Sequence, residues 1–263
     1  MEIPVYQVDA FANAAFSGNP AAVCPLETWL PDETLQAIAA ENNLSETAYF
    51  VRTGERHALR WFTPACEVDL CGHATLASAY VLFHELGAAW GVTSDTLRFD
   101  TKSGELVVRR DGERLAMDFP SRPPGPVKVD SGLVTAMGDE PLEILAARDY
   151  LLVYRSASEV RALAPNMEAL ARIDRFAFIA TAPGEDCDFV SRFFAPTKGV
   201  PEDPVTGSAH CTLIPYWAAK LGKTSLKARQ ISKRGGELFC RLNGDRVEMA
   251  GSAALFLRGH IIL

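Results

Sequence analysis

The chain has 263 residues, of which 48% are hydrophobic and 22% are charged, and its net charge at pH 7 is −7. This composition excludes disordered and fibrous proteins and allows one large domain or two medium-sized ones with cores of their own. The acidic balance argues against a nucleic-acid partner, and the lack of a signal-peptide pattern and of an apolar run of about 20 residues predicts a cytoplasmic protein with no membrane partner.

Taken in chain order, the first half predicts strands interrupted by two helices. The longer helix is apolar or small on nearly every face, so we expect it to be buried all round and to end at Gly87. A hairpin is expected at Asp111 and Gly112. The elements are strands at 3–11, 47–52, 57–63, 96–101, 104–110 and 113–119, a short helix opened by Pro31 and Asp32 that carries Leu35, Ile38 and Ala39, and the longer helix from His73 to Leu86.

The second half predicts the same order of elements. Pro215 lies inside its apolar helix, where a missing N–H costs about 3 kcal/mol, so we expect a kink or a late helical start there. The expected elements are strands near 150–155, 175–181 and 187–194, an apolar helix from Ser208 to Leu221, and a hairpin at Asn243 and Gly244.

The two halves also resemble each other in sequence. Two pairs of segments are separated by 132 residues and one pair of glycines by 135, which a three-residue insertion explains. A period near half the chain length indicates a duplicated domain, because solenoid repeats are about 20–50 residues long. The matching pairs are 62–64 with 194–196, 104–106 with 236–238, and Gly72 with Gly207.

These observations predict an α+β fold of two pseudo-symmetric domains, each a curled, mostly antiparallel sheet around a central buried helix. Residues 121–126, with three prolines and a glycine, suit a stiff linker. The predicted domains are therefore residues 1–121 and 127–263, and the last strand is allowed to cross back to the first domain.

The cysteines do not indicate a structural metal site. They form no Cys-x-x-Cys motif, and in a cytosolic chain we expect reduced thiols. The six are Cys24, Cys66, Cys71, Cys187, Cys211 and Cys240.

Two equivalent turns lead into the two apolar helices, and we expect the chemistry there. Each turn has a glycine that allows a ligand to approach the backbone, at Gly72 and at Gly207. A helix N-terminus offers unpaired N–H groups and roughly half a positive charge, which makes it an anion site. If both helix starts face one cleft, they hold a carboxylate and stabilise an enolate-like charge that develops on it.

Five motifs closely resemble the phenazine biosynthesis PhzF-like isomerases, within the diaminopimelate epimerase-like fold. The resemblance extends from residue 3 to the C-terminus. It implies two pseudo-symmetric domains with a cleft between them, no cofactor, often a homodimer, and an isomerisation in which a glutamate moves a proton between carbons of a small carboxylate substrate. The motifs are residues 7–11, 17–23, 43–48, 71–75 and 202–209.

Carried over residue by residue, the resemblance implies Glu46 as the acid/base, with His73, Asp203 and Ser208 in supporting positions. The substrate-binding candidates lie around them. Backbone amides near Gly72 and Gly207 would hold the carboxylate, Cys71 stands at the first turn, and Asn19 either reaches the cleft or only supplies a turn residue.

The physical chemistry of these side chains agrees with these roles, but it would not identify the same residues on its own. Glu46 lies at the start of a strand beside apolar neighbours, where desolvation favours the protonated carboxyl group and suits a general acid or base; a solvated loop carboxylate is the alternative. The positive helix end should keep His73 neutral. His73 has no partner at i+3 or i+4, so we expect no metal. Asp203 and Ser208 could instead only cap a turn and a helix.

One departure affects the mechanism. The cysteine-dependent epimerases of this fold carry a cysteine at both turns, whereas this chain has Cys71 at the first and Thr206 at the second. Because a threonine hydroxyl without a partner base is a poor acid/base, two-base racemisation is disfavoured. A Cys71-based epimerase or dehydratase, with the thiol pKa lowered by the helix end, is the alternative. A non-catalytic metabolite-binding protein is a second alternative.

Overall fold

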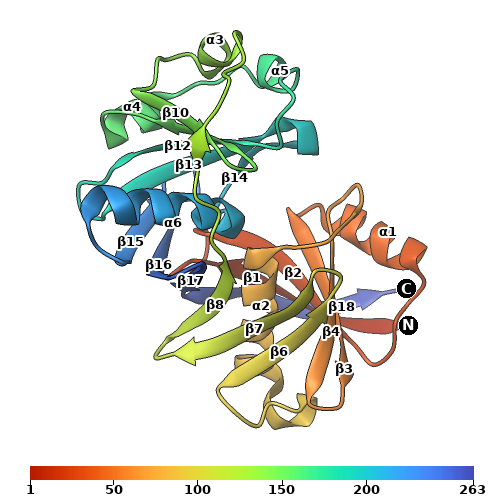
Figure 1. Ribbon diagram of the computed structural model, residues 1–263. Helices are drawn as coiled ribbons and strands as arrows, with labels where there is room; N and C mark the ends of the chain where they lie inside the picture. Colours follow the sequence, from red (N-terminus) through yellow and green to blue (C-terminus); the bar gives the residue numbers. More distant parts are fainter. The chain divides into compact units, whose positions relative to one another are not determined.

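The computed structural model describes residues 1–263 and divides into two compact units. Met1–Asp118 and Ala250–Leu263 form the first unit, and Phe119–Met249 form the second (Figure 1). The chain therefore returns to the first unit at its end, where the Leu263 N–H donates a hydrogen bond of 2.9 Å to the Met1 carbonyl. No helix has the length and apolar character that a bilayer crossing requires.

A mixed, mostly antiparallel sheet forms the frame of the first unit. Its strands are β1 (Glu2–Ala10), β2 (Asn19–Leu26), β3 (Glu46–Thr53), β4 (Arg56–Phe62), β5 (Glu67–Val68), β6 (Thr96–Thr101), β7 (Gly104–Asp111), β8 (Arg114–Pro120) and β18 (Ala253–Ile262). They are paired in the order β18, β1, β2, β3, β4, β6, β7 and β8, and β5 pairs with β4. Only the pairs β2–β3 and β4–β6 are parallel.

The first unit holds one buried helical segment and one peripheral helix. The helices are α1 (Asp32–Asn42), α2 (Gly72–Tyr80), the π-helical turn η1 (Val81–Leu86) and the 3-10 turn η2 (Gly87–Trp90). Helix α2 packs against β1, β2, β3 and β18, and every residue from His73 to Ala79 is buried. This confirms the prediction from its apolar faces, although its last turns widen into π geometry.

The second unit contains a sheet with the same pairing pattern. Its strands are β9 (Gly125–Pro126), β10 (Glu143–Ala146), β11 (Tyr150–Val153), β12 (Phe178–Pro183), β13 (Phe189–Ala195), β14 (Val200–Asp203), β15 (Ser225–Gln230), β16 (Gly236–Asn243) and β17 (Arg246–Gly251). The pairs β11–β12 and β13–β15 are parallel, and β9–β10, β10–β11, β12–β13, β13–β14 and β15–β16 are antiparallel.

The pairings of the two sheets correspond strand by strand. The series β1 to β7 alternates antiparallel, parallel, antiparallel, parallel and antiparallel, and the series β10 to β16 does the same. Strands β7 and β16 begin 132 residues apart, as the internal repeat predicts. The fold class predicted from the sequence is confirmed.

The second unit has a long helix that continues through its proline. Its helices are α3 (Leu133–Met137), α4 (Ala157–Ala162), α5 (Met167–Leu170), the 3-10 turn η3 (Pro196–Lys198) and α6 (Gly207–Leu221). Because Pro215 has no N–H, the carbonyl of Cys211 lacks its partner within α6, and it accepts the backbone N–H of Arg122 at 2.8 Å instead. Of the two outcomes expected at Pro215, a kink or a late helical start, the late start is wrong, because α6 begins at Gly207 and includes Pro215.

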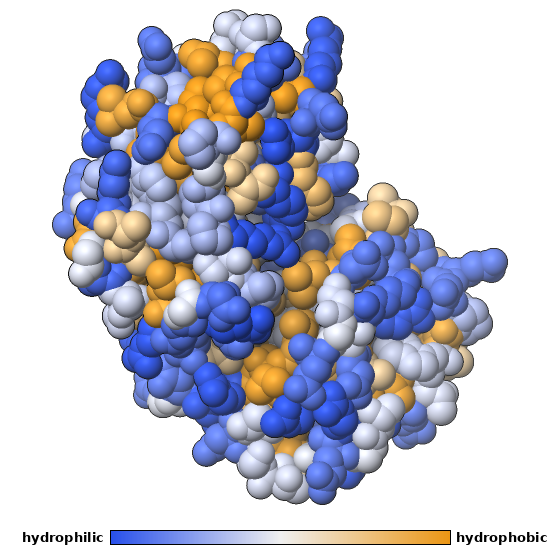
Figure 2. All heavy atoms as spheres, viewed as in Figure 1, coloured by the Kyte–Doolittle hydropathy of each residue, from blue (hydrophilic) through white to orange (hydrophobic).

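Figure 2 shows apolar atoms near α3 and α5 on the second unit, bordered by hydrophilic side chains. Among the exposed apolar side chains, the ring of Phe176 is overlaid by two cations. The guanidinium carbon of Arg148 lies 4.0 Å and the Nζ atom of Lys198 5.0 Å from its centroid. Cation–π contacts of this kind cover part of the exposed aromatic surface.

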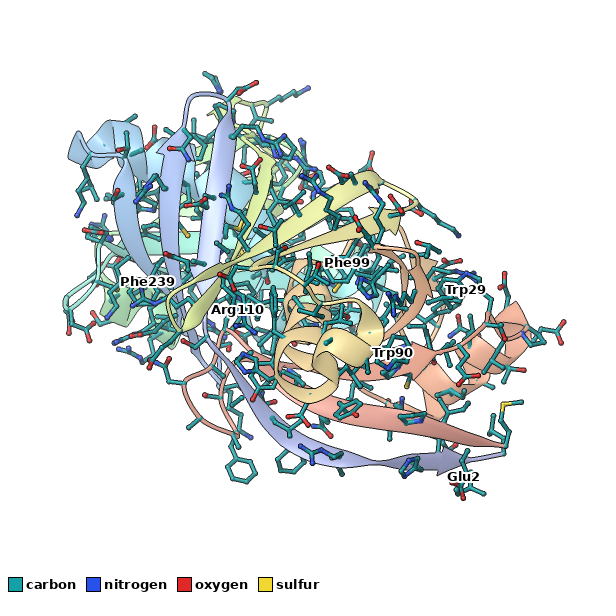
Figure 3. All side chains as sticks on the ribbon, turned by 90° about the horizontal axis from the view of Figure 1, so that it is seen from below. Glu2, Trp29, Trp90, Phe99, Arg110 and Phe239 are labelled. Atoms are coloured by element: carbon teal, nitrogen blue, oxygen red, sulfur yellow. The ribbon has the colours of Figure 1, made fainter.

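One buried histidine of the first unit belongs to the core. The ring of His57 meets that of Phe50 edge to face at 5.7 Å, and its Nε2 atom donates a hydrogen bond of 2.9 Å to the carbonyl of Trp90. Burial lowers the pKa of His57, so the ring is neutral. Trp90 and Phe99, which also contact this cluster, are labelled in Figure 3. We therefore assign His57 a packing role.

Candidate active site

The first unit brings Glu46 to the beginning of its buried helix. Glu46 is the first residue of β3 and pairs with Ala21 of β2, a strand against which α2 packs. Its side chain is 17% exposed. The alternative of a solvated loop carboxylate is therefore wrong for this residue.

His73 connects the parts of this cluster. It is the second residue of α2, and its side chain is 6% exposed. Its Nε2 atom lies 3.1 Å from Oε2 of Glu46, and its Nδ1 atom lies 3.5 Å from the sulfur of Cys71 and 3.3 Å from Nδ2 of Asn19. Asn19, Glu46, Cys71 and His73 are thus brought together within the first unit.

The charge state of His73 differs from the expectation. Burial alone would lower the pKa of His73, but the Cys71 sulfur and the Glu46 carboxylate raise it well above the ordinary value. The prediction of a neutral ring is therefore wrong, because a carboxylate at 3.1 Å outweighs the partial charge of the helix end.

Cys71 is the residue that precedes α2, and its thiol is not activated. Burial, and to a smaller extent the charge of Glu46, raises the pKa of the Cys71 thiol to about 11. The expectation that the helix end lowers this pKa is wrong, since desolvation is the larger effect. The Cys71 carbonyl accepts the Thr75 hydroxyl at 2.6 Å, which fixes the turn before Gly72.

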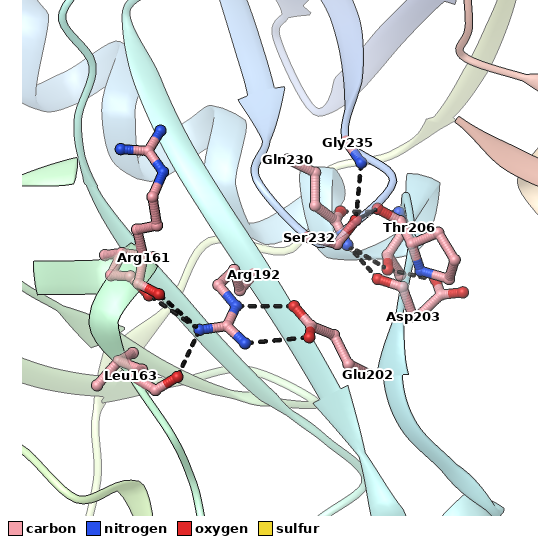
Figure 4. Close-up of polar contacts among 11 residues, drawn as sticks. Arg161, Leu163, Arg192, Glu202, Asp203, Thr206, Gln230, Ser232 and Gly235 are labelled. Atoms are coloured by element: carbon pink, nitrogen blue, oxygen red, sulfur yellow. Dashed lines mark hydrogen bonds and ion pairs between the residues drawn. The ribbon is translucent and has the colours of Figure 1, made fainter. Parts of the chain in front are cut away.

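The second unit holds Asp203 in a network of hydrogen bonds (Figure 4). The Thr206 hydroxyl donates a short hydrogen bond to Oδ2 of Asp203. Gln230 accepts the Thr206 N–H at 2.8 Å, and its own Nε2 donates to the Asp203 carbonyl at 2.7 Å and to the Thr206 hydroxyl at 3.2 Å. Gln230 is fully buried. The hydroxyl of Thr206 therefore orients Asp203.

Ser208 occupies in α6 the position that His73 occupies in α2. Its hydroxyl accepts Nη2 of Arg148 at 3.2 Å. Arg148 in turn makes two hydrogen bonds of 2.9 Å to Asp149, whose side chain is buried. Ser208 does not hold the N-cap position of α6, which is Thr206, and the Thr206 side chain makes no capping hydrogen bond. Its hydroxyl instead forms part of a polar group at the start of α6.

Sequence reasoning missed Gln230, Arg148 and Asp149. A signal for Gln230 exists: Leu226, Ala228 and Gln230 alternate along β15 and are all buried, so the period of two places Gln230 on the inner face. No comparable pattern indicates the Arg148 pair, because adjacent opposite charges are common on surfaces.

The comparisons with solved structures define the fold. A phenazine biosynthesis PhzF family protein of Enterococcus faecalis superposes with a TM-score of 0.96 and 46% identity, over 100% of both chains. A hydroxyproline epimerase of Agrobacterium vitis superposes with a TM-score of 0.61 over 99% of this chain and 92% of its own, at 10% identity. The second likeness shows the fold alone, which is that of the epimerase-like proteins.

The comparisons with sequences define the family. Residues 8–259 match the family described as phenazine biosynthesis-like protein. A protein of Pseudomonas aeruginosa that is named an isomerase is 53% identical over 263 residues, which cover 100% of both chains. A phenazine biosynthesis-like domain-containing protein of Rattus norvegicus is 43% identical over 288 residues, which cover 98% of this chain and 99% of its own. The chain belongs to the PhzC-PhzF family of phenazine biosynthesis-like proteins, which confirms the resemblance drawn from its motifs.

Proposed function

We propose that the chain is a cofactor-independent isomerase that moves a proton between two carbons of a small carboxylate, with Glu46 as the general acid/base. The observation that carries the proposal is the Glu46 carboxylate, held 3.1 Å from the buried imidazole of His73 beside the start of α2. A carboxyl group held against a buried imidazole is positioned to exchange a proton with a bound substrate. The names of its relatives as isomerases support the same reaction class.

In the proposed reaction, Glu46 removes a proton from a carbon of the substrate. A C–H bond breaks and an O–H bond forms on Glu46, while the electron pair moves into the substrate and gives it enolate-like charge. The Glu46 carboxyl group then returns the proton to another carbon, so no net oxidation occurs. His73 stays protonated and balances the negative charge at the site.

The starts of the two buried helices are the candidate anion-binding positions. In the first unit the Gly72 amide begins α2 beside Glu46 and is a candidate donor to the substrate carboxylate. In the second unit the equivalent turn begins α6 at Gly207, where Thr206 orients Asp203 and Arg148 contacts Ser208. We propose that Asp203 and Ser208 have the supporting roles that the family resemblance implies.

A screen for turnover tests this proposal. Small hydroxy, amino and aromatic acids are incubated with the chain in D2O without added cofactor, and NMR follows deuterium incorporation and isomer formation. The proposal predicts an isomer that carries deuterium from solvent. Saturable binding of an acid with neither exchange nor an isomer would favour a metabolite-binding protein instead. We further propose a cytoplasmic homodimer, which cell fractionation and light scattering test.

A further inference from the structure

Three side chains with different metal-binding chemistry meet at the start of α2. Glu46 offers a carboxylate oxygen, Cys71 a sulfur and His73 a ring nitrogen, and one such atom from each lies within 4.8 Å of the other two. Ligand atoms in a tetrahedral zinc site are separated by about 3.3–3.6 Å, given the usual Zn–N and Zn–S distances. Small side-chain movements would therefore close the three atoms around one ion.

Two of these atoms lack aligned hydrogen bonds although they are buried. Nε2 of His73 and Oε2 of Glu46 face each other at 3.1 Å without hydrogen-bond geometry, and neither has another partner. Buried polar atoms are normally satisfied. A cation bound by both atoms would satisfy them. The sulfur of Cys71 lies 3.5 Å from Nδ1, the other ring nitrogen of His73, so to serve as the third ligand it must turn toward the ion at Nε2, and the three ligand atoms start within 4.8 Å of one another.

The charges and the ligand types favour zinc. A thiolate and a carboxylate neutralise a divalent ion, so the buried complex carries no net charge. Sulfur and imidazole nitrogen suit Zn²⁺, whereas Mg²⁺ and Ca²⁺ require oxygen ligands. We propose that Glu46, Cys71 and His73 form a binding site for a single Zn²⁺ ion, which would exclude substrate from the same residues.

The binding step balances without a redox partner. The Cys71 S–H bond and one N–H bond of the His73 imidazolium break, and both protons go to solvent. Bonds from zinc to sulfur, nitrogen and the Glu46 oxygen form. Because protons are released, zinc affinity must increase with pH. Sequence spacing did not indicate this site, because Glu46 comes from β3 rather than from the helix that carries His73.

Zinc binding is tested on the full chain after removal of metals with a chelator. Calorimetry with Zn²⁺ alone should give one ion per chain, and Co²⁺ should produce a thiolate-to-cobalt charge-transfer band. Cys71→Ser should abolish the band and weaken zinc binding by at least about 100-fold. Cys66→Ser, which changes an exposed cysteine outside the cluster, should leave both unchanged. Glu46→Gln, a partly exposed and nearly isosteric change, should weaken binding without loss of the fold.

The outcomes separate zinc binding from catalysis. The proposed site would be overturned if the chain failed to bind Zn²⁺. It would also be overturned if zinc affinity were unchanged in Cys71→Ser, or if it fell in Cys66→Ser. Inhibition by zinc rests on the proposed function: in an active preparation, zinc should inhibit the wild type reversibly, and a chelator should restore turnover. Full turnover with one equivalent of zinc bound would contradict the claim that zinc and substrate use the same residues. A chain that binds zinc but isomerises no carboxylate would uphold the site and refute the function.

Discussion

Nε2 of His73 lies 3.1 Å from Oε2 of Glu46, which places an acid and a base in contact at the start of α2. The strand that carries Glu46 and the helix that carries His73 are packed together inside the first unit. The pair is therefore fixed by the core of the unit. Glu46 is one of the groups that raise the pKa of His73, so a change at Glu46 must be measurable at His73.

We predict that Glu46→Gln lowers the pKa of His73. The carboxylate is one of the two neighbours that hold this pKa above its ordinary value, and burial opposes them. A titration of the imidazole resonances by NMR, in buffer with a chelator, measures the change. A His73 pKa that does not move would show that Glu46 is not its charge partner.

The same pair should make stability depend on pH. A histidine whose pKa rises on folding stabilises the folded chain below the unfolded value of about 6.5, and this contribution is lost as the pH rises through the folded pKa. We expect His73→Asn to lower the free energy of unfolding more at about pH 6 than at alkaline pH above the folded value. Urea denaturation at several pH values checks this, and an equal loss at every pH would contradict it.

Cys71→Ala should lower the isomerase activity far less than the loss of a general acid/base would. Burial holds the pKa of the thiol at about 11, so almost no thiolate is present at neutral pH to act as a base. Measured kcat/KM should fall by less than about 10-fold, against the 100-fold or larger loss expected for a true acid/base. A greater loss for Cys71→Ala than for Glu46→Gln would support the cysteine-based alternative.

Gln230→Met should damage both stability and catalysis. The buried N–H of Thr206 loses its acceptor, which costs about 1–3 kcal/mol. The turn that holds Asp203 also loses two donors, and a misplacement of about 1 Å can reduce kcat roughly 100-fold. Ser156→Ala is the control, because it removes the acceptor of the Glu159 N–H at the start of α4, and the hydrogen bonds of Ser156 go to Ser158 and Glu159 rather than to Asp203 or Thr206. Equal kcat values for the two variants would show that Gln230 has only a structural role.

Pro215→Ala should change the free energy of unfolding by less than about 1 kcal/mol, rather than stabilise the chain by the ~3 kcal/mol of an ordinary helix proline. The Cys211 carbonyl is already satisfied by the Arg122 N–H, so the restored N–H of residue 215 gains little. Thermal or urea denaturation measures the difference. A gain of the full amount would mean that the contact with Arg122 does not compensate for the proline.

Several elements were predictable because local physics decides them. The hairpins at Gly112 and Gly244 form where Asp-Gly and Asn-Gly indicate them, and both glycines have the positive φ that such turns need, +63° and +61°. Helices α2 and α6 are buried because their sequences leave no polar face. The short helix is also confirmed, because the helical spacing of Leu35 and Ile38 places both side chains on its buried face.

The remaining features depend on contacts between distant segments. The charge of His73 could not be inferred from its helix position alone, because the deciding carboxylate comes from β3. Likewise, the hydrogen bond that replaces the missing N–H of Pro215 joins Arg122 to Cys211, which are 211 − 122 = 89 positions apart. The motifs predicted residues of which four, Asn19, Glu46, Cys71 and His73, lie together in the first unit, whereas the hydrogen-bond networks around them and in the second unit required the structure.

The most direct test of the proposed acid/base compares Glu46→Gln with Glu41→Gln, a change of the same kind at an exposed position of α1. Each variant is incubated in D2O with a carboxylate that the wild type isomerises. NMR then measures both the rate of isomerisation and the deuterium in the product. We predict that Glu46→Gln loses about 10²–10⁴-fold in rate, and with it the incorporation of deuterium, while Glu41→Gln matches the wild type. Full turnover and exchange in Glu46→Gln would contradict the assignment.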